Sequence, residues 1–481
     1  TIDGGEGTDI AVYSGNQAEY LVEQTLLGTR VTHQGNGSDG IDLLLGVNRL
    51  RFQDGTIDVT ASAVTAVGGA ANDSLSGGEG NDTITGSSGN DTLRGSIGDD
   101  LLDGGAGDDY IYGEDGNDSL LGGENNDYLD GGNGRDTVDG GAGDDTIYEN
   151  ANGDWISTSG SILLGGEGND SITGGRSGGL TIVGGSGDDR IASPGGDSIE
   201  GGTGNDEISI AYRNPIADWT FEGLDGGDGF DVLVLRYYGN SGNYTQDLSV
   251  ARNFEKVIIS SDTGGVVLGN TVFASGVSGV IEASGRGMSV DASGESDATL
   301  TLYGFDQADG YGEDSITGGQ LSDYIYGRRG NDTLRGGSGN DTIDGGEGTD
   351  IAVYSGNQAN YSIAEIAYGT WIVRDNVGSE GEDLLLGINT LRFADGDQQV
   401  VVPGLVIVGT ENDDDLDGGD NDDDIDGIGG DDTIHGKNGK DKIKGGTGKD
   451  RAHGDAGSDL IEGNEDAVSY THLRAHETRE D

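Results

Sequence analysis

Several residue types are missing or scarce in this chain of 481 residues: it has no cysteine, one methionine and only three prolines. The lack of cysteine excludes disulfide cross-links and thiolate metal sites. No apolar run approaches the ~18 residues of a membrane-spanning helix, and no signal peptide heads the chain. Glycine, at 97 residues, is about threefold above its usual share. Because proline is so rare, this glycine predicts ordered turns rather than a flexible Pro/Gly-rich linker.

Positive charge is also scarce. Lys and Arg total 25 against 89 for Asp and Glu, so the net charge is 25 − 89 = −64. This charge excludes nucleic acids and anionic membranes as electrostatic partners. Hydrophobic residues make up only 32% of the chain, so self-repulsion is expected to keep it expanded until a cation neutralises it.

What the chain has in abundance is a nine-residue period. Nine units run from 68 to 148 without an insertion, and GGEGNDTIT (77–85) and GGAGDDYIY (104–112) are typical of them. The sixth residue of every unit is Asp and the eighth is Leu, Ile or Val. A fixed period of this kind predicts a solenoid of stacked units.

Each unit divides into a glycine-rich turn and a three-residue strand. Side chains alternate between faces along a strand, so stacking buries one apolar residue per unit while its two neighbours face solvent. Such a thin core requires a second source of stability. The predicted apolar column is Ile84, Leu93, Leu102, Ile111, Leu120, Leu129, Val138 and Ile147.

The aspartates supply that second source if a metal is present. Stacking places them in columns, where carboxylates a strand spacing apart repel one another. Calcium takes six to eight oxygen ligands from carboxylates and from carbonyls of the kind that glycine turns expose. Soft ligands are lacking, and histidine occurs only five times. We therefore predict calcium, rather than aspartates that merely cap turns, at Asp73, Asp82, Asp91, Asp100, Asp109, Asp118, Asp127, Asp136 and Asp145.

The same unit recurs elsewhere in the chain. A looser series follows 165, a third array runs from about 310 to 353, a fourth spans 409–462, and a single unit stands at 4–12. Their sixth-position aspartates, together with Asp197 of the shortened repeat GGDSIE (195–200), are further predicted ligands: Asp9, Asp170, Asp189, Asp197, Asp206, Asp231, Asp314, Asp323, Asp332, Asp341, Asp350, Asp414, Asp423, Asp432, Asp441, Asp450 and Asp459.

Some units depart from the pattern. The glycine at the fourth position is replaced by Ala71, Asn125, Asn412 and Asn421, and we expect those turns to bind less well. The stretch GGRSGGLTI at 174–182 has no Asp in place, which predicts a missing site.

A longer repeat joins two distant parts of the chain. Residues 2–18 recur unchanged as 343–359, and the similarity resumes at 42–55 and 383–396 with the same offset of 341. We interpret each copy as a last nonapeptide followed by a small β cap, because a solenoid must cover its open apolar end. The expected cap cores are Tyr13, Tyr20, Leu50 and Phe52, and Tyr354, Tyr361, Leu391 and Phe393.

The chain is therefore predicted to be all-β. Residues 207–303 are β-rich without the metal signature; continued coils are favoured there over an inserted sandwich. Residues 467–481 break the composition and are expected to be non-native. The predicted segments are 1–60 (repeat end and cap), 68–148, 149–206, 207–303, 304–353, 354–402 (second cap), 409–466 and 467–481.

The arrays resemble the RTX family of hemolysin-type calcium-binding repeats from Gram-negative bacteria. The resemblance implies a right-handed parallel β-roll (a β-solenoid) in which two nonapeptides complete one turn and calcium ions lie between stacked turns. Asp82 would then pair with Asp100, and Asp91 with Asp109. Backbone carbonyls would complete the calcium shells, among them those of Gly77, Gly78, Gly80, Gly104, Gly105, Gly107, Gly336, Gly337 and Gly339.

The resemblance also implies export as an unfolded chain through a type I secretion apparatus, followed by calcium-driven folding outside the cell. The family's C-terminal secretion signal would follow the last array. Because Thr1 is not an initiator methionine and the chain begins inside a repeat, we expect it to be a fragment of an extracellular or cell-surface protein.

No motif predicts catalysis. Residues 175–179 match G-x-S-x-G, but glycine is so frequent that chance matches are expected, and no strand–elbow–helix context surrounds them. Residues 413–418 imitate the start of an EF-hand without flanking helices. The sequence favours a non-enzymatic adhesin or surface-matrix protein with unidentified surface partners. The alternative is the C-terminal region of a secreted RTX protease, lipase, polysaccharide-modifying enzyme or toxin.

Overall fold

The structure is a computed structural model that describes most of the chain. The chain forms two compact units, one made of residues 1–240 and 250–258 and the other of residues 241–249 and 259–481. The described residues are 1–3, 10–25, 28–34, 41–45, 47, 49–58, 63–149, 160–175, 178–212, 223–237, 245–260, 264–283, 287–305, 312–367, 369–400, 404–419 and 421–462. No helix among these residues is long and apolar enough to cross a membrane. Asp9 and the segment 467–481 lie outside them.

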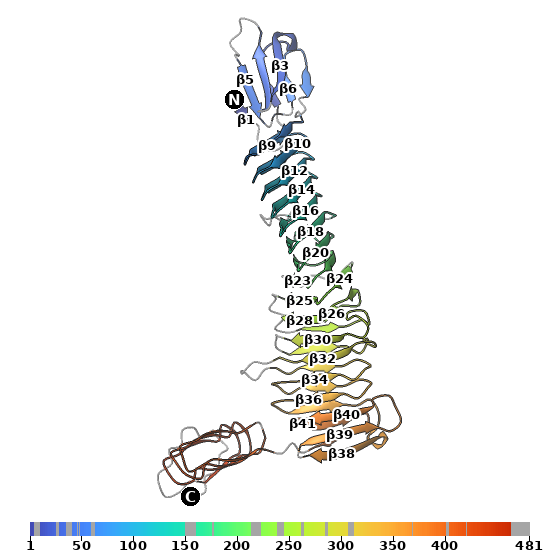
Figure 1. Cartoon of the computed structure of the whole chain (residues 1–481), viewed down its shortest axis with the longest axis vertical. Helices are drawn as coiled ribbons and strands as arrows, with labels where there is room; N and C mark the ends of the chain where they lie inside the picture. The colour runs from blue at the N-terminus through green and yellow to red at the C-terminus, as the bar shows by residue number, and fades with distance from the viewer. Residues whose placement is uncertain are drawn as a thin grey trace. The chain divides into compact units, whose positions relative to one another are not determined.

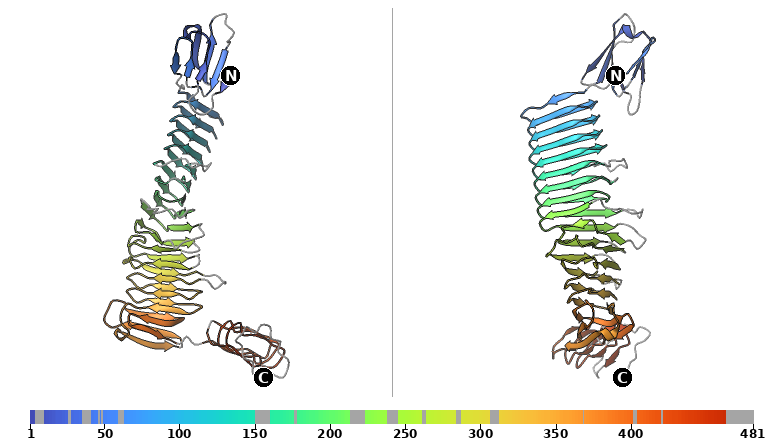
Figure 2. Two further views of the ribbon diagram at one scale, coloured as in Figure 1. Left: turned by 180° about the vertical axis from the view of Figure 1, so that it is seen from behind. Right: turned by 90° about the vertical axis from the view of Figure 1, so that its right-hand side faces the viewer.

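In the first unit, the nonapeptides form two parallel sheets whose strands alternate along the chain. Ile84 pairs with Leu102 in one sheet, and Leu93 pairs with Ile111 in the other. Every uninterrupted step within a sheet is 18 residues, so two nonapeptides make one turn of the solenoid, as the resemblance implied. Figure 2 shows the resulting ladder of parallel strands.

The strands of this unit are longer than the predicted three residues, because many run on into the first glycines of the next repeat. One sheet contains β8 (Thr65–Val67), β10 (Thr83–Ser88), β12 (Leu101–Ala106), β14 (Ser119–Glu124), β16 (Thr137–Ala142), β18 (Ile162–Glu167), β20 (Thr181–Ser186), β22 (Ser198–Thr203), β24 (Gly223–Asp228) and β27 (Ala251–Arg252). The other contains β9 (Ser74–Glu79), β11 (Thr92–Ile97), β13 (Tyr110–Asp115), β15 (Tyr128–Asn133), β17 (Thr146–Tyr148), β19 (Ser171–Thr173), β21 (Arg190–Ser193), β23 (Glu207–Tyr212) and β25 (Val232–Tyr237). β28 (Lys256–Ser260) spans the boundary between the units.

The core is the predicted single column. Its eight members from Ile84 to Ile147 are at most 2% exposed. Between Asp82 and Asp145, the sixth-position aspartates are buried as well, at no more than 3% exposure. The interior of the array therefore holds an apolar column flanked by carboxylates.

Coils also continue through 207–303. β23 pairs with β25 in parallel, from Glu207 with Val232 to Tyr212 with Tyr237. In the second unit, β29 pairs with β31 and β30 with β32, again in parallel. The described strands here are therefore stacked coils, the arrangement favoured from the sequence over a sandwich.

The second unit repeats the two-sheet pattern (Figure 1). One sheet contains β26 (Thr245–Asp247), β29 (Gly264–Val267), β31 (Met288–Asp291), β33 (Ser315–Thr317), β35 (Thr333–Arg335), β37 (Asp350–Val353), β41 (Ile388–Phe393) and β42 (Gly396–Gln399). The other contains β30 (Ser278–Ala283), β32 (Thr299–Tyr303), β34 (Tyr324–Tyr326), β36 (Thr342–Asp344), β40 (Glu382–Leu386), β39 (Thr370–Asp375) and β38 (Tyr361–Ala367). The short 3₁₀ helix η2 (Gln358–Asn360) precedes β38.

The predicted cap at 354–402 is built onto the last turn of the third array. β40 pairs in parallel with β36, and β41 with β37, so the cap first continues both sheets. β39 then pairs antiparallel with β40, and β38 with β39. This reversal ends the parallel stacking.

The first cap has the same internal pairing. It contains β1 (Ile2–Asp3), β2 (Ile10–Val12), η1 (Gln17–Glu19), β3 (Tyr20–Thr25), β4 (Gly28–His33), β5 (Ile41–Leu45), β6 (Arg49–Arg51) and β7 (Thr56–Asp58). β1 pairs with β5 and β2 with β6 in parallel, as β36 pairs with β40 and β37 with β41 in the second copy.

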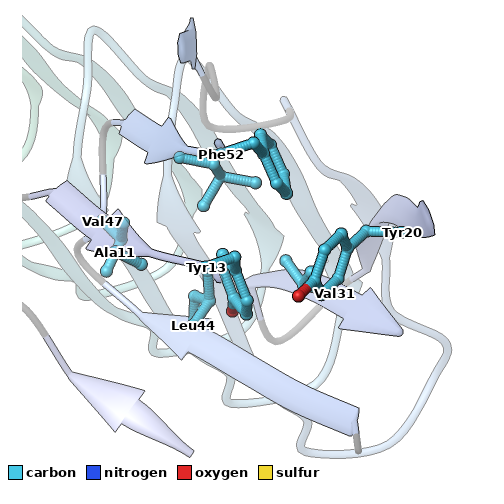
Figure 3. Close-up of a cluster of buried hydrophobic side chains, with 8 residues drawn as sticks. Ala11, Tyr13, Tyr20, Val31, Leu44, Val47 and Phe52 are labelled. Atoms are coloured by element: carbon cyan, nitrogen blue, oxygen red, sulfur yellow. The ribbon is translucent and has the colours of Figure 1, made fainter. Parts of the chain in front are cut away.

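The two cap cores are also alike. The ring centroid of Tyr13 lies 5.0 Å from that of Tyr20 and 5.6 Å from that of Phe52, and Figure 3 shows this cluster. In the second cap the ring of Tyr354 lies 5.1 Å from Tyr361 and 5.5 Å from Phe393. The sequence duplication is therefore a duplication of structure.

The fourth array has its own apolar column, Ile425, Ile434, Ile443 and Ala452. It contains β43 (Val406–Val408), β44 (Asp415–Asp417), β45 (Asp424–Asp426), β46 (Thr433–His435), β47 (Asn438–Gly439), β48 (Lys442–Lys444), β49 (Arg451–His453), β50 (Ala456–Gly457) and β51 (Leu460–Glu462).

The apolar column predicts a clear difference between core and flank substitutions. Leu129→Ala should lower the free energy of unfolding by about 2–5 kcal/mol, because it opens a cavity in a one-residue-wide core. Thr137→Ala, at an exposed flank position, should change it by no more than ~0.5 kcal/mol. Denaturant titration in saturating calcium measures both, and equal effects would contradict a single-column core.

Candidate metal centres

Most of the described sixth-position aspartates lie at a turn, directly before a strand, and contact the equivalent aspartate one turn later. The backbone N–H of Asp82 donates to Oδ1 of Asp100, and that of Asp91 to Oδ1 of Asp109, both at 2.7 Å. The same bond recurs in the third and fourth arrays, for example from Asp323 to Asp341 at 2.8 Å. The carboxylates therefore stand in columns, with the neighbours that the resemblance implied.

The second carboxylate oxygen, Oδ2, is different. In most turns it is buried and accepts no hydrogen bond from any described residue. A buried carboxylate oxygen without a donor is costly unless a proton or a cation satisfies it. The aspartates with such an Oδ2 are Asp82, Asp91, Asp100, Asp109, Asp118, Asp127, Asp136, Asp145, Asp170, Asp189, Asp206, Asp231, Asp332, Asp341, Asp350, Asp432, Asp441 and Asp459.

Each of these oxygens lies beside the first glycine of its own repeat, in the space that the missing side chain leaves open. We call this space the cradle. A Cβ placed on Gly77 would collide with Oδ2 of Asp82 and would lie 2.8 Å from the carbonyl oxygen of Gly95, one turn later. The space thus brings together a carboxylate oxygen and a backbone carbonyl with no donor between them. An all-oxygen set with negative charge is the donor chemistry that calcium prefers. The residues fit the predicted metal.

The residue at the second position decides whether Oδ2 is free. In the turns with an unsatisfied Oδ2 this residue is left-handed, as at Gly78 (φ 118°) and even Ser87 (φ 82°). Gly69, Gly319 and Gly419 do not adopt this conformation. Their N–H groups donate instead to Oδ2 of Asp73, Asp323 and Asp423, at 2.6–2.7 Å.

Other predicted ligands share this satisfied state. Oδ2 of Asp314 accepts the N–H of Phe305, that of Asp414 accepts both donors of Thr410, and that of Asp197 accepts the hydroxyl of Ser193. Units with a satisfied Oδ2 stand early in arrays one, three and four, or in the shortened repeat. They include three of the four turns in which we expected weaker binding, those with Ala71, Asn412 and Asn421, and also the turn of Asp323, in which Leu321 replaces the same glycine.

Burial disfavours the ionised form of the carboxylates whose Oδ2 has no hydrogen-bond donor. Desolvation is the main cause that raises the pKa of Asp118 to about 7, with the charges of Asp136 and Asp100 adding to it. It also raises the pKa of Asp127 to about 8, and those of Asp332 and Asp341 to about 8. In each case a backbone N–H offsets part of the shift. Without a metal, a proton is the competing occupant of these columns.

The sequence did not reveal how the columns end. Glu255 accepts the N–H of Asp231 at 2.7 Å, in place of a further aspartate. In the second cap, Asp383 accepts the N–H of Asp341 at 3.0 Å, and Asn389 that of Asp350 at 2.6 Å. All three lie outside the nonapeptide pattern. The one signal for Asp383 was its place in the duplicated DLLLG, which begins at Asp42 in the first copy.

Glu149 was also missed. It stands where the next repeat would place its first glycine, is fully buried, and receives no hydrogen bond of normal geometry at either carboxylate oxygen from the residues that the structure describes. Desolvation raises its pKa to about 8, although the nearby Ser161 hydroxyl lowers it in part. Ser161 takes the place of the column aspartate by accepting the N–H of Asp136 at 2.9 Å.

The repeat at 174–182, predicted to lack a site, has no aspartate of its own at the cradle. A Cβ on Gly174 would meet the side chains of Leu180 and Ile182, at 3.0 and 3.2 Å, and would lie 3.6 Å from Oδ2 of Asp197. The glycines whose carbonyl oxygens were predicted to bind calcium fall into two groups. Those at the second and fourth positions have positive φ: Gly78, Gly80, Gly105, Gly107, Gly337 and Gly339. Those at the first position form the cradles: Gly77, Gly104 and Gly336.

Comparison with known proteins identifies the repeats. The family model of the RTX calcium-binding nonapeptide repeat matches residues 65–93, 85–120, 94–129, 121–156, 158–177, 191–209, 317–352 and 435–467. Among solved structures, the extracellular lipase LipA from Serratia marcescens is similar, with 24% identity and a TM-score of 0.21. The match covers 42% of this chain and 37% of the lipase chain, so it spans well under half the length of that protein. No curated protein matches the chain.

The two states of Oδ2 predict different outcomes for neighbouring substitutions. Asp332→Asn, at an unsatisfied oxygen, should remove or weaken one calcium site by on the order of tenfold, because calcium affinity depends on ligand charge. Asp323→Asn should cost stability by losing the Gly319 bond but should leave the number of bound ions unchanged. Equilibrium dialysis against radioactive calcium compares the two; equal losses of calcium would contradict the distinction.

The raised pKa values predict that acid substitutes for calcium. Carboxylates whose folded pKa lies above the unfolded value of ~3.9 favour the metal-free fold at low pH, and that support is lost as pH rises through the folded values. Because several of these values are about 6 to 8, the metal-free chain should gain β-structure as pH falls from 8 to 5. Circular dichroism of metal-depleted protein measures this gain, and a spectrum unchanged across that range would refute it.

Proposed function

Because the chain carries RTX calcium-binding nonapeptide repeats, we propose that it is the non-catalytic, calcium-folded region of a secreted bacterial protein. The observation that carries this proposal is the column of buried Oδ2 atoms that have no hydrogen-bond donor among the described residues and that a metal cation would satisfy. Where no site exists before folding, the free energy of metal binding becomes free energy of folding. Calcium then has the role that a larger apolar core or disulfides have in other proteins.

The place of folding follows from calcium availability. Calcium sites of extracellular modules have dissociation constants of roughly 10⁻⁴ to 10⁻³ M. A chain of net charge −64 stays extended where calcium is scarcer than this, which suits passage through a secretion channel. It orders after release, where calcium is abundant. This order of events supports secretion through a type I apparatus.

For the parent protein, we propose a repetitive adhesin or surface-matrix protein. The supporting observation is the duplicated cap, which repeats its strand pairing and its aromatic cluster. A module of array and cap that occurs twice extends a protein in space and displays it to cell-surface or matrix partners. A region that only assists the folding of one enzyme has no need of a second copy.

The competing parent is a secreted RTX enzyme or toxin with this region at its C-terminal side. The coding sequence on either side of the chain distinguishes the two. Further copies of the 341-residue unit support the adhesin, whereas a hydrolase domain with an assembled catalytic site would overturn it and leave calcium-driven folding intact.

Calcium-driven folding is directly measurable. Far-ultraviolet circular dichroism at pH 8 should show a largely disordered chain in chelator and a β-rich one in millimolar calcium. Magnesium should be a poor substitute, because it demands a small, near-ideal octahedral site and dehydrates reluctantly. A spectrum that does not respond to calcium would refute the proposed function.

A further inference from the structure

A second kind of metal-binding group stands on the outer surface of the fourth array. His435 ends β46 and His453 ends β49, and the parallel register pairs the two residues directly. Their imidazole rings stack with centroids 4.6 Å apart and an angle of 4° between planes. Nδ1 of His435 lies 3.1 Å from Oδ2 of Asp455. One ligand atom from each of the three residues lies within 4.8 Å of the others.

The stacking geometry holds the carboxylate in place. In this chain, the ninth residue of a repeat recurrently contacts the second residue of a later repeat, 20 positions further on. Arg94 pairs with Glu114 at 3.0 Å and Asp417 with Lys437 at 3.5 Å. Asp455 reaches His435 in the same way, from a left-handed backbone (φ 59°). The group therefore stands on ordered strands and a fixed turn, not on a free loop.

A simple ion pair is the alternative explanation, since the pairs before it are ion pairs. An ion pair or a hydrogen bond between His435 and Asp455 gives no role to His453, whose ring lies face to face with that of His435 at a centroid distance of 4.6 Å. Two imidazoles beside one carboxylate place three metal-ligand atoms within 4.8 Å of one another.

We propose that His435, His453 and Asp455 bind a zinc-class divalent cation, separately from the calcium sites. Imidazole nitrogen is a ligand for zinc, copper and nickel, whereas calcium takes oxygen. Two histidines and one carboxylate are a known protein ligand set for zinc, with a fourth position left to water. The proposal does not depend on the calcium function, because none of the three is a sixth-position aspartate.

Binding requires the side chains to turn, because rings stacked face to face direct their nitrogen lone pairs in parallel planes, whereas a shared metal must lie in the plane of each ring. Zinc–nitrogen bonds of ~2.0–2.1 Å place tetrahedral ligands about 3.4 Å apart, against a present spread of up to 4.8 Å. The side chains of His435 and Asp455 are 37% and 41% exposed, so their rotation meets little resistance. The preceding residue in the column, Asp417, is already paired with Lys437 and so does not compete for the metal.

The test uses the full chain, saturated with calcium, in a background with His472→Gln and His476→Gln. That background removes the two histidines of the C-terminal segment. Calorimetric titration with zinc chloride should show one site per chain. His453→Gln should weaken it about tenfold or more, a loss of about 1.4 kcal/mol or more, and Asp455→Asn should weaken it less. His33→Gln, in the first cap, should bind zinc as the background does.

A second measurement separates this site from the aspartate columns. Cobalt(II) in place of zinc should give the visible absorption of a tetrahedral nitrogen–oxygen site, and His435→Gln/His453→Gln should abolish it. Far-ultraviolet circular dichroism in calcium confirms that each variant is folded. Zinc binding that survives the double substitution, or no zinc binding by the folded background protein, would overturn the proposal. Neither result would affect calcium-driven folding.

Discussion

The arrays depend on one unfavourable feature, a carboxylate oxygen turned into the interior where no protein group donates to it. The fold creates this situation at turn after turn and in both columns at once. Other local features follow from it. The first position must be glycine because a side chain there would occupy the cradle, and the second must be left-handed so that its N–H does not satisfy the oxygen. The array is thus organised to leave a place for a cation.

The nonapeptide period was sufficient to predict the apolar column and the aspartate columns, while the caps were predicted from the longer repeat with its offset of 341 residues. Each column depends on residue identity at a fixed position, and the 18-residue step preserves position. Asp323 and Asp341 both follow a Gly-Gly pair, but only Gly337, in the turn of Asp341, is left-handed. The sequence carries one difference between these turns, because the fourth position is Leu321 in the first and Gly339 in the second. That signal is not sufficient by itself, since the turn of Asp127 has Asn125 at the fourth position and still keeps a left-handed Gly123.

Residues that act in the columns without belonging to the repeat were also beyond prediction. Glu255, Asp383 and Asn389 reach the aspartates only because the coil brings distant segments together. Glu149 was hidden for the opposite reason, since it occupies a position that the pattern reserves for glycine. The core residues of the caps, in contrast, could be predicted, because they are aromatic and aliphatic side chains that pack in the ordinary way. The chain therefore combines metal-dependent arrays with caps whose cores need no metal.

The hydrogen bonds between successive aspartates all run in one direction: the amide of each turn is received by the carboxylate of the turn that follows it. The final turn of the third array has no successor of its own kind, and Asp383 and Asn389 stand in for one. The two ends of the third array are therefore not equivalent: its last amides take acceptors from the cap, whereas its first carboxylates accept the ordinary backbone N–H groups of Met288 and Leu300. A turn added at the beginning would leave the junction with the cap unchanged, but a turn added at the end would separate Asp341 and Asp350 from the two residues that terminate their columns.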